Sequence, residues 1–563
     1  MRGALIWPLL KRRAATASGA VEPQCTEHPG PPKSEPVREH RAGSKERGEL
    51  QLELSLLCRN PPVVPICVGS ECTTGCVCRQ VMPFDHKRTA TYYNQACSHT
   101  IAMGMEWAAR TQPCWERTPV QQRCEIFDRA ADLMAGRYRQ KIIAAAMMGQ
   151  GMTAIQAEHN ICQLIDYTRF NSNFLRDLTM SRCVTDGAPT GKNLNHYHGL
   201  EGFFAAITPN DSFSNAGQLA ITPAIMGNGV VWKPSQYSIL ACYRIFQSLL
   251  EAGLPVGVIN FVPAEENCFL NTACCSRKLA GVAFGGTTSA LETIWKRIGD
   301  NIKNFDRFPR IAGTGSGKNF HIIHESADMK CAVANTIRAA FEMAGQKTTS
   351  CSRAYVHHSV LRVFLLALSC QLPRLFITHP LDYRCFTSSV ISAEAYDRVV
   401  GYLNTYVHDG QCELMVGGRA DCSVGYYIEP TVIQASCPDH PLLLQELRGP
   451  VLTVYPFGDL VDLVEAVGMA PYAVCGSVFA TDLAWARCAV EAVRDLATLV
   501  VVNDRCSEEL PAHQSLGGTR KSGPGSKAGS ISYLLSYCSE RSLREVLQPN
   551  CNVTYDYMSD CPC

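Results

Sequence analysis

The sequence lacks the features that would place it outside ordinary globular proteins. It has no run of about 18 apolar residues, so no segment predicts a membrane-spanning helix. The formal net charge is only +1 over 563 residues, which does not indicate nucleic acid or an acidic membrane surface as the main partner. Charged residues make up 18% and hydrophobic residues 46% of the chain, a soluble globular profile. A chain of this length exceeds one hydrophobic core, so two or three domains are expected.

The cysteines lack the regular spacing of a disulfide framework. There are 29 of them, an odd number, so they cannot all pair within one chain. The densest group is Cys72, Cys76 and Cys78. A zinc site would need two spaced pairs together with His or further Cys partners. Scattered free thiols are therefore favoured over a metal centre, and no metal is expected.

Acidic residues are missing from the start of the chain. None occurs before Glu22, whereas basic residues stand at Arg2, Lys11, Arg12 and Arg13. This composition, with Thr16 and Ser18, predicts a mitochondrial transit peptide over residues 1–21. A secretory signal centred on residues 4–10 is the rival interpretation. Pro8 interrupts its apolar run and a basic triplet follows directly, so the mitochondrial interpretation is preferred.

Residues 22–50 are rich in Pro, Glu, Arg, Gly and Ser. This composition predicts a poorly ordered leader.

Regular structure is predicted more clearly after about residue 100. Thr118 and Pro119 form a helix start, followed by an apolar stripe at helical spacing that includes Phe127, Ala130 and Met134. Short apolar runs then alternate with helical stretches. The runs occupy residues 202–209, 230–235, 257–264 and 279–288, with a helix over 237–253 between the second and third. This rhythm predicts a parallel sheet covered by helices, and residues 320–505 repeat it as a second α/β domain.

The usual dinucleotide fingerprint G-x-G-x-x-G is absent. Polar groups nevertheless stand at the predicted strand ends, at Thr208, Lys233 and Thr287. Ligands of parallel sheets bind at that edge, and Gly286 with Thr287 could admit a phosphate at a helix start. A strand-end lysine is also common as a plain surface group, so residue types alone leave the nucleotide site open.

Six short motifs, taken in their order along the chain, indicate a protein family. They are "WKPS" (232–235), "FGGT" (284–287), "GKNF" (317–320), "GQK" (345–347), "ELRGPVLTVY" (446–455) and "LGG" (516–518). Their order resembles that of the aldehyde dehydrogenases. Stretches such as "GLEGFFAAITP" (199–209), "FPRIAG" (308–313) and "VGYYIEPTVI" (424–433) are most similar to the Δ1-pyrroline-5-carboxylate dehydrogenase branch, also called L-glutamate γ-semialdehyde dehydrogenase. The resemblance runs from about residue 35 to the end.

The resemblance implies an α/β aldehyde-dehydrogenase fold in three parts. A Rossmann-like NAD-binding domain would take residues 51–170 and 196–314, and an α/β catalytic domain residues 315–510. A small β oligomerisation flap and tail would take residues 171–195 and 520–563. The family oxidises glutamate γ-semialdehyde to glutamate with NAD in the mitochondrial matrix, and its dimers form through the flap.

For the cofactor, the resemblance places NAD on five positions of this chain. Lys233 and Glu446 match the ribose contacts, and Gly286 and Thr287 match the phosphate side; Thr208 is the neighbouring strand end. Arg448 stands where the family has a nicotinamide-side Phe.

The catalytic positions depart from the family. Its nucleophilic Cys falls on Thr348, its general-base Glu on Thr314, and its oxyanion-binding Asn on Asp211. A threonine hydroxyl is a far weaker nucleophile than a thiolate unless a base takes its proton, and Thr314 cannot act as a base near neutral pH. A carboxylate beside a developing oxyanion repels it, where even neutral loss of a donor costs roughly a hundred- to a thousandfold.

The substrate end departs as well. The family holds the substrate carboxylate with a Gly-Ser pair that falls on Glu508 and Glu509, two acids that would repel it. Cys351, three residues past Thr348, lies roughly 10 Å along an extended chain and is expected to be an ordinary packed thiol.

Three functions therefore remain open from the sequence. The chain is an active dehydrogenase for a small-molecule aldehyde, or a non-catalytic NAD-binding protein. The resemblance implies a homodimer or a heterodimer with an intact family member, and the substituted positions predict that catalysis is lost or strongly impaired. The third interpretation is a decaying gene copy in which catalysis and folding are both impaired.

Overall fold

The computed structural model describes residues 30–180, 183–184, 191–407, 409–508, 510–546 and 549–558. The chain divides into two units, residues 1–32 and 33–563. Every helix and strand given below belongs to the second unit. The expected transit peptide over residues 1–21 and the expected anchor residue Glu509 lie outside the described residues.

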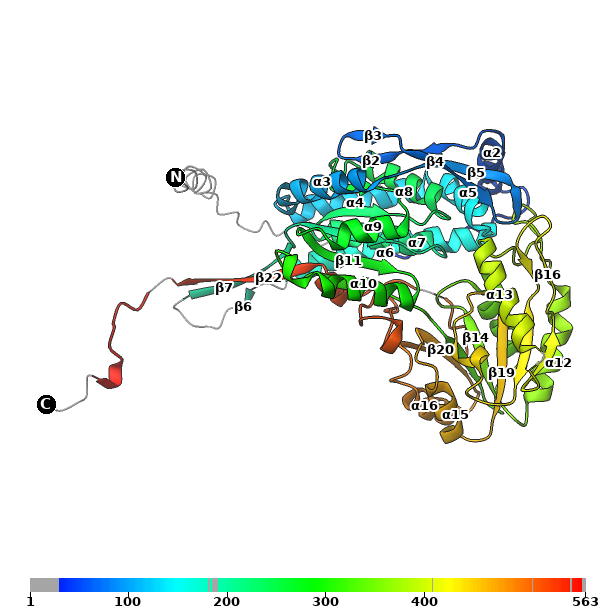
Figure 1. The fold of residues 1–563 in the computed structure, drawn as a ribbon. Coiled ribbons are helices and arrows are strands. Elements are labelled where there is room, and N and C mark those ends of the chain that lie inside the picture. The colour runs from blue at the N-terminus through cyan, green and yellow to red at the C-terminus, as the bar shows by residue number, and fades with distance from the viewer. Residues whose placement is uncertain are drawn as a thin grey trace. The chain divides into compact units, whose positions relative to one another are not determined.

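A seven-stranded sheet forms the core of the first α/β domain (Figure 1). In spatial order its strands are β12 (Arg310–Thr314), β11 (Leu279–Gly285), β8 (Phe203–Ile207), β9 (Gly229–Lys233), β10 (Ile259–Phe261), β2 (Ile66–Val68) and β3 (Glu71–Thr73). The first five are parallel, and the β2–β3 hairpin is added antiparallel at one side. The strands at 203–207, 229–233, 259–261 and 279–285 confirm the four predicted apolar runs.

Helices cover both faces of this sheet. Alternate residues of β8 enter two separate cores, Phe204 and Ala206 on one face and Phe203 and Ala205 on the other. The helices on the first face are α4 (Val120–Ala135), α5 (Arg139–Gln150), α6 (Ala154–Met180), α7 (Phe213–Ile225) and α8 (Ile239–Glu251). Those on the second are α3 (Ser98–Glu116), α9 (Glu266–Cys274) and α10 (Thr288–Asp300). Both faces of the sheet are buried, which explains why the strands are continuous apolar runs rather than alternating apolar and polar residues.

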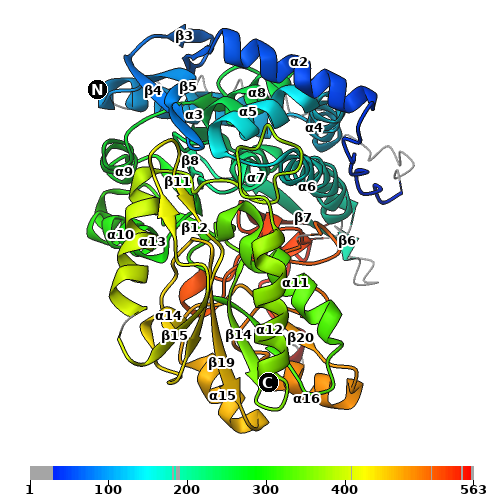
Figure 2. The ribbon, with the colours of Figure 1, turned by 90° about the vertical axis from the view of Figure 1, so that its right-hand side faces the viewer.

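A second seven-stranded sheet forms the other α/β domain. Its order is β15 (Cys412–Val416), β18 (Thr431–Ala435), β19 (Val451–Phe457), β14 (Cys351–His357), β13 (Asn319–Ile323), β20 (Cys475–Phe479) and β21 (Leu499–Val502). Its helices are α11 (Met329–Phe341), α12 (Leu361–Gln371), α13 (Ala393–Tyr406), α14 (Pro441–Leu444), α15 (Leu460–Gly468) and α16 (Leu483–Ala492). Figure 2 shows α11 and α12 in front of this sheet. The chain crosses between the two sheets over residues 315–318.

Smaller elements complete the fold. A three-stranded sheet joins β1 (Val63–Val64), β5 (Asp85–Gln95) and β4 (Cys76–Met82), and a short hairpin joins β16 (Ala420–Asp421) to β17 (Tyr427–Ile428). Helix α17 (Ile531–Leu535) precedes the last strand.

The flap is a separate three-stranded sheet. It consists of β22 (Cys538–Val546), β7 (Gly191–Gly199) and β6 (Cys183–Val184). β7 and β22 pair antiparallel along their whole length, from Cys538 opposite Gly199 to Val546 opposite Gly191, and extend together away from the first domain (Figure 1). The expected boundaries differ, because residues 171–180 belong to α6 and β7 continues past residue 195.

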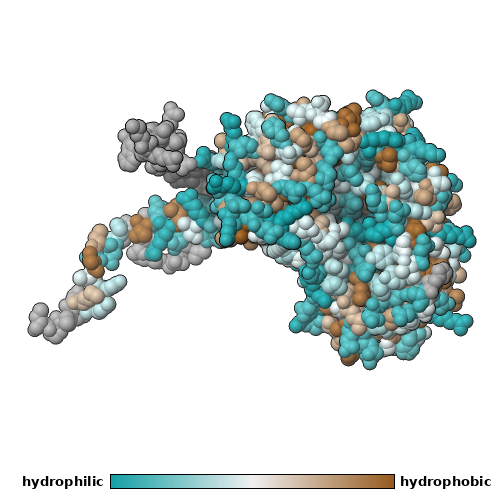
Figure 3. Space-filling view, in the orientation of Figure 1, coloured by the Kyte–Doolittle hydropathy of each residue, from teal (hydrophilic) through white to brown (hydrophobic). Residues whose placement is uncertain are grey.

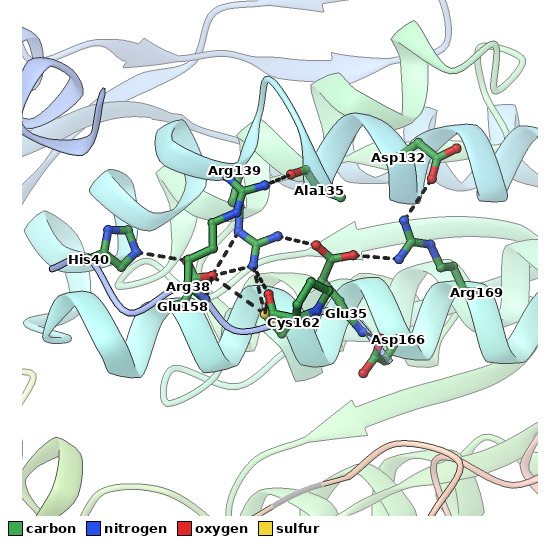
Figure 4. A network of polar contacts seen from close by, with 11 residues as sticks. Glu35, Arg38, His40, Asp132, Ala135, Arg139, Glu158, Cys162, Asp166 and Arg169 are labelled. Atoms are coloured by element: carbon green, nitrogen blue, oxygen red, sulfur yellow. Dashed lines mark hydrogen bonds and ion pairs between the residues drawn. The ribbon is translucent and has the colours of Figure 1, made fainter. Parts of the chain in front are cut away.

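The expectation of a poorly ordered leader over residues 22–50 is wrong for its second half. Helix α2 (Lys45–Arg59) begins inside this range, capped by Ser44, and buries Leu50 completely. Two of the residues before it, Glu35 and His40, are paired with side chains of the packed domain. Figure 4 shows the guanidinium of Arg139, on α5, between the carboxylates of Glu158, on α6, and Glu35. Composition counted these charges as a sign of disorder, whereas tertiary pairing makes them part of the packed fold.

The helices and one face of the surface bear on membrane contact. Among the described residues, none of the helices combines the length and the apolarity needed to cross a bilayer. On the face drawn in Figure 3, hydrophilic and hydrophobic residues are interspersed over the surface.

Candidate active site

Four of the five predicted cofactor positions line one cavity. β8, β9 and β11 are parallel neighbours, so their carboxyl ends meet at one edge of the sheet. Thr208, Lys233, Gly286 and Thr287 follow or end these strands and line a cavity of about 440 Å³. This is the size expected for a small-molecule pocket, at the position where open α/β sheets bind ligands. Glu446 is not among the lining residues.

The polar groups of this cavity suit a nucleotide. Lys233 is buried, and burial lowers the pKa of its amine, against the opposing effect of Glu266 and Glu265 at the rim. Thr287 is the N-cap of α10, where its side chain accepts a hydrogen bond from Ala290 N. The N-terminus of this 13-residue helix carries a partial positive charge that favours a phosphate, although the backbone N–H groups of Thr288 and Ala290 already donate to Ser316 Oγ and Thr287 Oγ1.

The nucleophile and base positions meet in a second, smaller cavity. Thr348 and Thr314 both line a space of about 40 Å³. Gly286 lines this cavity and the larger one, so the two are neighbours. The arrangement of the positions therefore agrees with the resemblance, although the residues that occupy them do not supply its chemistry.

Asp211 is bonded directly to Thr348. The backbone N–H of Thr348 donates to Oδ2 of Asp211 at 2.9 Å, and its hydroxyl donates to the same oxygen at 2.8 Å. Asp211 is only 3% exposed, and its other oxygen, Oδ1, is buried without a hydrogen bond. A carboxylate has only acceptors, so it cannot donate to an oxyanion. The same carboxylate accepts the hydrogen bond of the Thr348 backbone N–H, so this donor is not available to an oxyanion either.

The Thr348 loop is held by a residue to which the sequence analysis gave no role. Asn319, in the "GKNF" motif, donates from Nδ2 to the carbonyl oxygens of Thr348 at 2.8 Å and Ser350 at 3.0 Å. Its Oδ1 accepts from Val474 N and Cys475 N. An amide that bonds on both sides ties the loop to β20. In the sequence, the place of Asn319 in the "GKNF" motif was the available signal.

Arg448 occupies the side of the larger cavity nearest the smaller one. Its Nη2 donates to Gly286 O at 2.9 Å, and its Nε lies 3.1 Å from Oε2 of Glu446. Burial lowers the pKa of its guanidinium, but the charges of Glu446 and Asp211 outweigh this and raise it. Arg448 has φ 49°, a left-handed conformation uncommon for a residue other than glycine.

The geometry fits only part of an NAD molecule. Lys233, Gly286 and Thr287 suit its adenosine and phosphate portion. Glu446 is engaged on both oxygens, since Oε1 accepts from Gly317 N at 2.8 Å and Oε2 pairs with Arg448. Arg448, which by the resemblance stands at the family's nicotinamide-side position, holds its guanidinium between Gly286 O and Glu446. The residues of this chain therefore fit the adenosine diphosphate portion and do not fit the nicotinamide portion.

Two other reactive groups near the site are buried. Cys351 is fully buried on β14, its Sγ donates to Arg353 O at 3.4 Å, and burial raises the pKa of its thiol well above the ordinary value. This confirms that it is a packed thiol and excludes it as a replacement nucleophile. Lys318 is also fully buried; burial, and then Arg353, lowers the pKa of its amine to about 7, and its Nζ has no hydrogen-bond partner.

Glu508, the described half of the expected anchor pair, lies in a different place from Thr348. It lines a separate cavity of about 150 Å³ with Lys347, Glu342 and Arg505. Arg505 Nη2 pairs with its Oε2 at 3.0 Å. A neighbouring arginine offsets the negative charge that was expected to repel a substrate carboxylate.

One group of described residues has the donor types of a metal site. The donor atoms of Asp409, Cys412 and His440 lie within 4.8 Å of one another. Hydrogen bonds already account for both ring nitrogens of His440, since Nε2 bonds Asp409 at 2.7 Å and Nδ1 accepts from Leu442 N. This histidine is the N-cap of α14, and we assign it that structural role.

The fold and the two adjoining cavities define the class of protein. A model described as the aldehyde dehydrogenase family matches residues 73–543. The chain belongs to the aldehyde dehydrogenase family, and the predicted α/β fold of that family is confirmed.

Similar proteins share one activity in their names. The human mitochondrial Δ1-pyrroline-5-carboxylate dehydrogenase is 36% identical over 93% of this chain and 94% of its own length. The Dictyostelium discoideum protein of the same name is 33% identical over 94% of this chain and 96% of its own. The NAD-bound structure of the Mycobacterium tuberculosis Δ1-pyrroline-5-carboxylate dehydrogenase superimposes with a TM-score of 0.90 at 32% identity, covering 95% of this chain and 99% of that one.

Proposed function

We propose that this chain is a nucleotide-binding member of the Δ1-pyrroline-5-carboxylate dehydrogenase group that has lost the oxidation of glutamate γ-semialdehyde. It binds NAD through the adenosine diphosphate portion, at Thr208, Lys233, Gly286 and Thr287. The relatives named above and the retained cavity of about 440 Å³ support this proposal.

The observation that carries the loss of catalysis is the pair of hydrogen bonds from Thr348 to Asp211. Oxidation through a covalent adduct needs a nucleophile, a donor to the oxyanion and a base for water. In this chain the hydroxyl at the nucleophile position faces a carboxylate, no side-chain amide stands at the donor position, and Thr314 supplies no base. Residues that act as a unit lose function together, so isolated recovery of one role is not expected to restore turnover.

The relatives support a location for this protein, and its flap supports a partner. The leader composition and the names of the mitochondrial relatives support the mitochondrial matrix.

The flap of β7 and β22 exposes Leu543 and Val546 at its outer strand, which supports pairing with a second copy or with an intact family member. Purification of the tagged chain together with the intact enzyme tests this, and recovery of the chain alone as a monomer contradicts it.

The test of catalysis is NADH formation from NAD and L-glutamate γ-semialdehyde. The natural mature chain is compared with the Thr348→Cys, Thr314→Glu double variant at equal concentration. We expect no signal above the blank from the natural chain. Turnover by the natural chain would overturn the proposed loss, and the chain would then be an active dehydrogenase of its family.

A further inference from the structure

The hairpin of β2 and β3 brings two thiols together at one side of the first sheet. Cys67 lies opposite Cys72 in the antiparallel register, and their Sγ atoms are 3.0 Å apart. Both are free cysteines. Cys67 is only 5% exposed and lies in the hydrophobic core, whereas Cys72 is exposed. The pair therefore joins an interior thiol to one that solvent reaches.

The backbone at this pair has the geometry that a disulfide bond requires. Two residues form the turn of the hairpin, and the first of them, Gly69, has φ 56°, as a type II′ turn requires. The pair that closes such a turn, Val68 with Glu71, is a hydrogen-bonded pair, so the next pair along the hairpin is not. The Cα atoms of a non-hydrogen-bonded pair are about 4.5 Å apart, within the range of about 4.4–6.8 Å that disulfides span. Cys67 and Cys72 can therefore be joined without moving either strand.

Contacts from the first domain fix the hairpin in place. The backbone N–H of Gly69 donates to Oδ1 of the buried Asn260 at 2.8 Å. Trp107 lies so close to Gly69 that a Cβ there would come within 2.6 Å of its ring. On its other side β2 pairs with β10, where Cys67 is opposite Phe261. The two thiols are therefore held next to each other before any reaction takes place.

The other two thiols of this region are placed differently. Cys76 and Cys78 are two positions apart on β4, so their side chains point to the same face about 6.6 Å apart along the strand. The Cβ atoms of a disulfide are about 3.5–4.5 Å apart, so these two cannot join each other. Cys78 Sγ instead donates to Gln95 Oε1 at 3.0 Å.

The two thiols of the hairpin differ in role because they differ in access. Burial raises the pKa of the Cys67 thiol, so it stays protonated and away from an oxidant dissolved in water. Cys72 is exposed, and oxidation of a cysteine depends on its exposure and on its thiolate fraction. Cys72 is therefore the thiol that an oxidant meets first.

We propose that Cys67 and Cys72 form a reversible oxidation site for small hydroperoxides. The thiolate of Cys72 attacks one oxygen of the hydroperoxide and the O–O bond breaks. Cys72 becomes a sulfenic acid, and the departing oxygen takes up the proton that Cys72 gave up and leaves as an alcohol or as water. The sulfur of Cys67 then forms the S–S bond, and its proton leaves with the hydroxyl of Cys72 as water. One hydroperoxide is reduced by two electrons while two thiols are oxidised, and exchange with another dithiol restores them.

The test treats the reduced full chain with hydrogen peroxide. Trypsin releases residues 60–79 as one peptide, which holds Cys67, Cys72, Cys76 and Cys78 and no other cysteine. After oxidation the chain is unfolded, its free thiols are blocked with iodoacetamide, the bridge is reduced and the released thiols are marked with N-ethylmaleimide. Tandem mass spectrometry of the peptide is expected to find N-ethylmaleimide on Cys67 and Cys72 together, and iodoacetamide on Cys76 and Cys78.

Three variants separate the steps. In Cys67→Ser the sulfenic acid of Cys72 has no partner, so dimedone should trap several-fold more of it than in the natural chain. In Cys72→Ser, Cys67 should stay unoxidised because it is buried. Cys76→Ser, at an exposed neighbouring thiol, is the matched control and should leave the yield of the bridge unchanged.

Three results would overturn the proposal. One is N-ethylmaleimide on Cys72 together with Cys76 or Cys78 in place of Cys67. Another is iodoacetamide on all four thiols at a peroxide concentration that oxidises the exposed Cys97. The third is equal trapping by dimedone in the natural chain and in Cys67→Ser. If Cys67→Ser does not fold, the labelling of the natural chain and of Cys72→Ser, which changes an exposed position, decides the question.

Discussion

Two clusters of buried charge in this molecule are built in opposite ways. The first, which we call the anchor cluster, consists of Glu35, His40, Arg139 and Glu158 and lies between the N-terminal segment, α5 and α6 (Figure 4). The second, which we call the central cluster, consists of Asp211, Thr348, Glu446 and Arg448. Both hold carboxylates and an arginine away from solvent.

The clusters differ in how completely their polar groups are satisfied. In the anchor cluster, Glu158 receives hydrogen bonds from Arg139, from the backbone of Arg38 and from His40, and the unsatisfied buried atom is the ring Nδ1 of His40 rather than an atom of a carboxylate or guanidinium. In the central cluster, Oδ1 of Asp211 and Nε of Arg448 are buried without hydrogen bonds. A satisfied buried network supports a unique fold, whereas unsatisfied groups are a cost that native proteins confine to a few places. The carboxylates and the arginine are therefore fully paired in the anchor cluster and incompletely paired in the central cluster.

The largest expected effect concerns the anchor cluster. Arg139→Met removes a cation that is completely buried, and leaves Glu158 with His40 and Glu35 with Arg169 as the remaining ion-pair partners. Breaking such a pair is expected to lower the free energy of unfolding by about 3–5 kcal/mol. Urea unfolding followed by tryptophan fluorescence measures the change. Arg494→Met, at an exposed ion pair, is the control and should change it by less than about 1 kcal/mol; equal effects of the two variants would show that the cluster does not anchor the segment.

The next effect concerns the central cluster. Adding Asp211→Asn to the Thr348→Cys, Thr314→Glu background replaces an acceptor by an amide that can donate to the oxyanion. Such a donor is worth about a hundred- to a thousandfold in turnover, so the triple variant should exceed the double variant by that factor in NADH formation. Equal rates in the two variants would mean that Asp211 does not stand at the oxyanion.

The acid dependence of stability separates the clusters further. Burial raises the pKa of Glu158, but the bonds from His40 and Arg139 outweigh this and lower it to about 2. A lowered folded-state pKa contributes stability above the unfolded value near 4.5, and the contribution, about 3 kcal/mol, is lost as the pH falls from there towards 2. The stability difference between the natural chain and Glu158→Gln should therefore shrink between pH 5 and pH 3. A constant difference over that range would contradict the assignment.

The smallest effect is expected at Cys351. Its thiol is fully buried, so iodoacetamide should label it only after denaturation, whereas the exposed Cys72 should react in the native chain. Cys351→Ser should leave nucleotide affinity unchanged. Labelling of native Cys351, read by peptide mass spectrometry at a rate near that of Cys72, would reopen it as a nucleophile.

Local patterns predicted the strands of the sheets and the cavity at their carboxyl ends. The strand ends at Thr208, Lys233 and Gly286 meet because parallel strands place their carboxyl ends at one edge, and apolar runs marked those strands. The bond between Thr348 and Asp211 joins residues 137 positions apart, and no local pattern reports such a contact. The packing of Glu35 against Arg139 was missed for the same reason. Glu508 was assigned by alignment, which gave its position in the chain and could not show that Arg505 pairs with it.

The pairing of β7 with β22 has a consequence for how the chain is made. The two partners are separated by more than 300 residues, and Asn228 Nδ2 also bonds the carbonyl of Tyr537, 309 positions later. At about 5–20 residues per second, a ribosome needs tens of seconds to pass from one strand to the other. The edge of β7 that pairs with β22 thus stays open until translation is nearly complete, and during that interval it is exposed to pairing with a wrong strand.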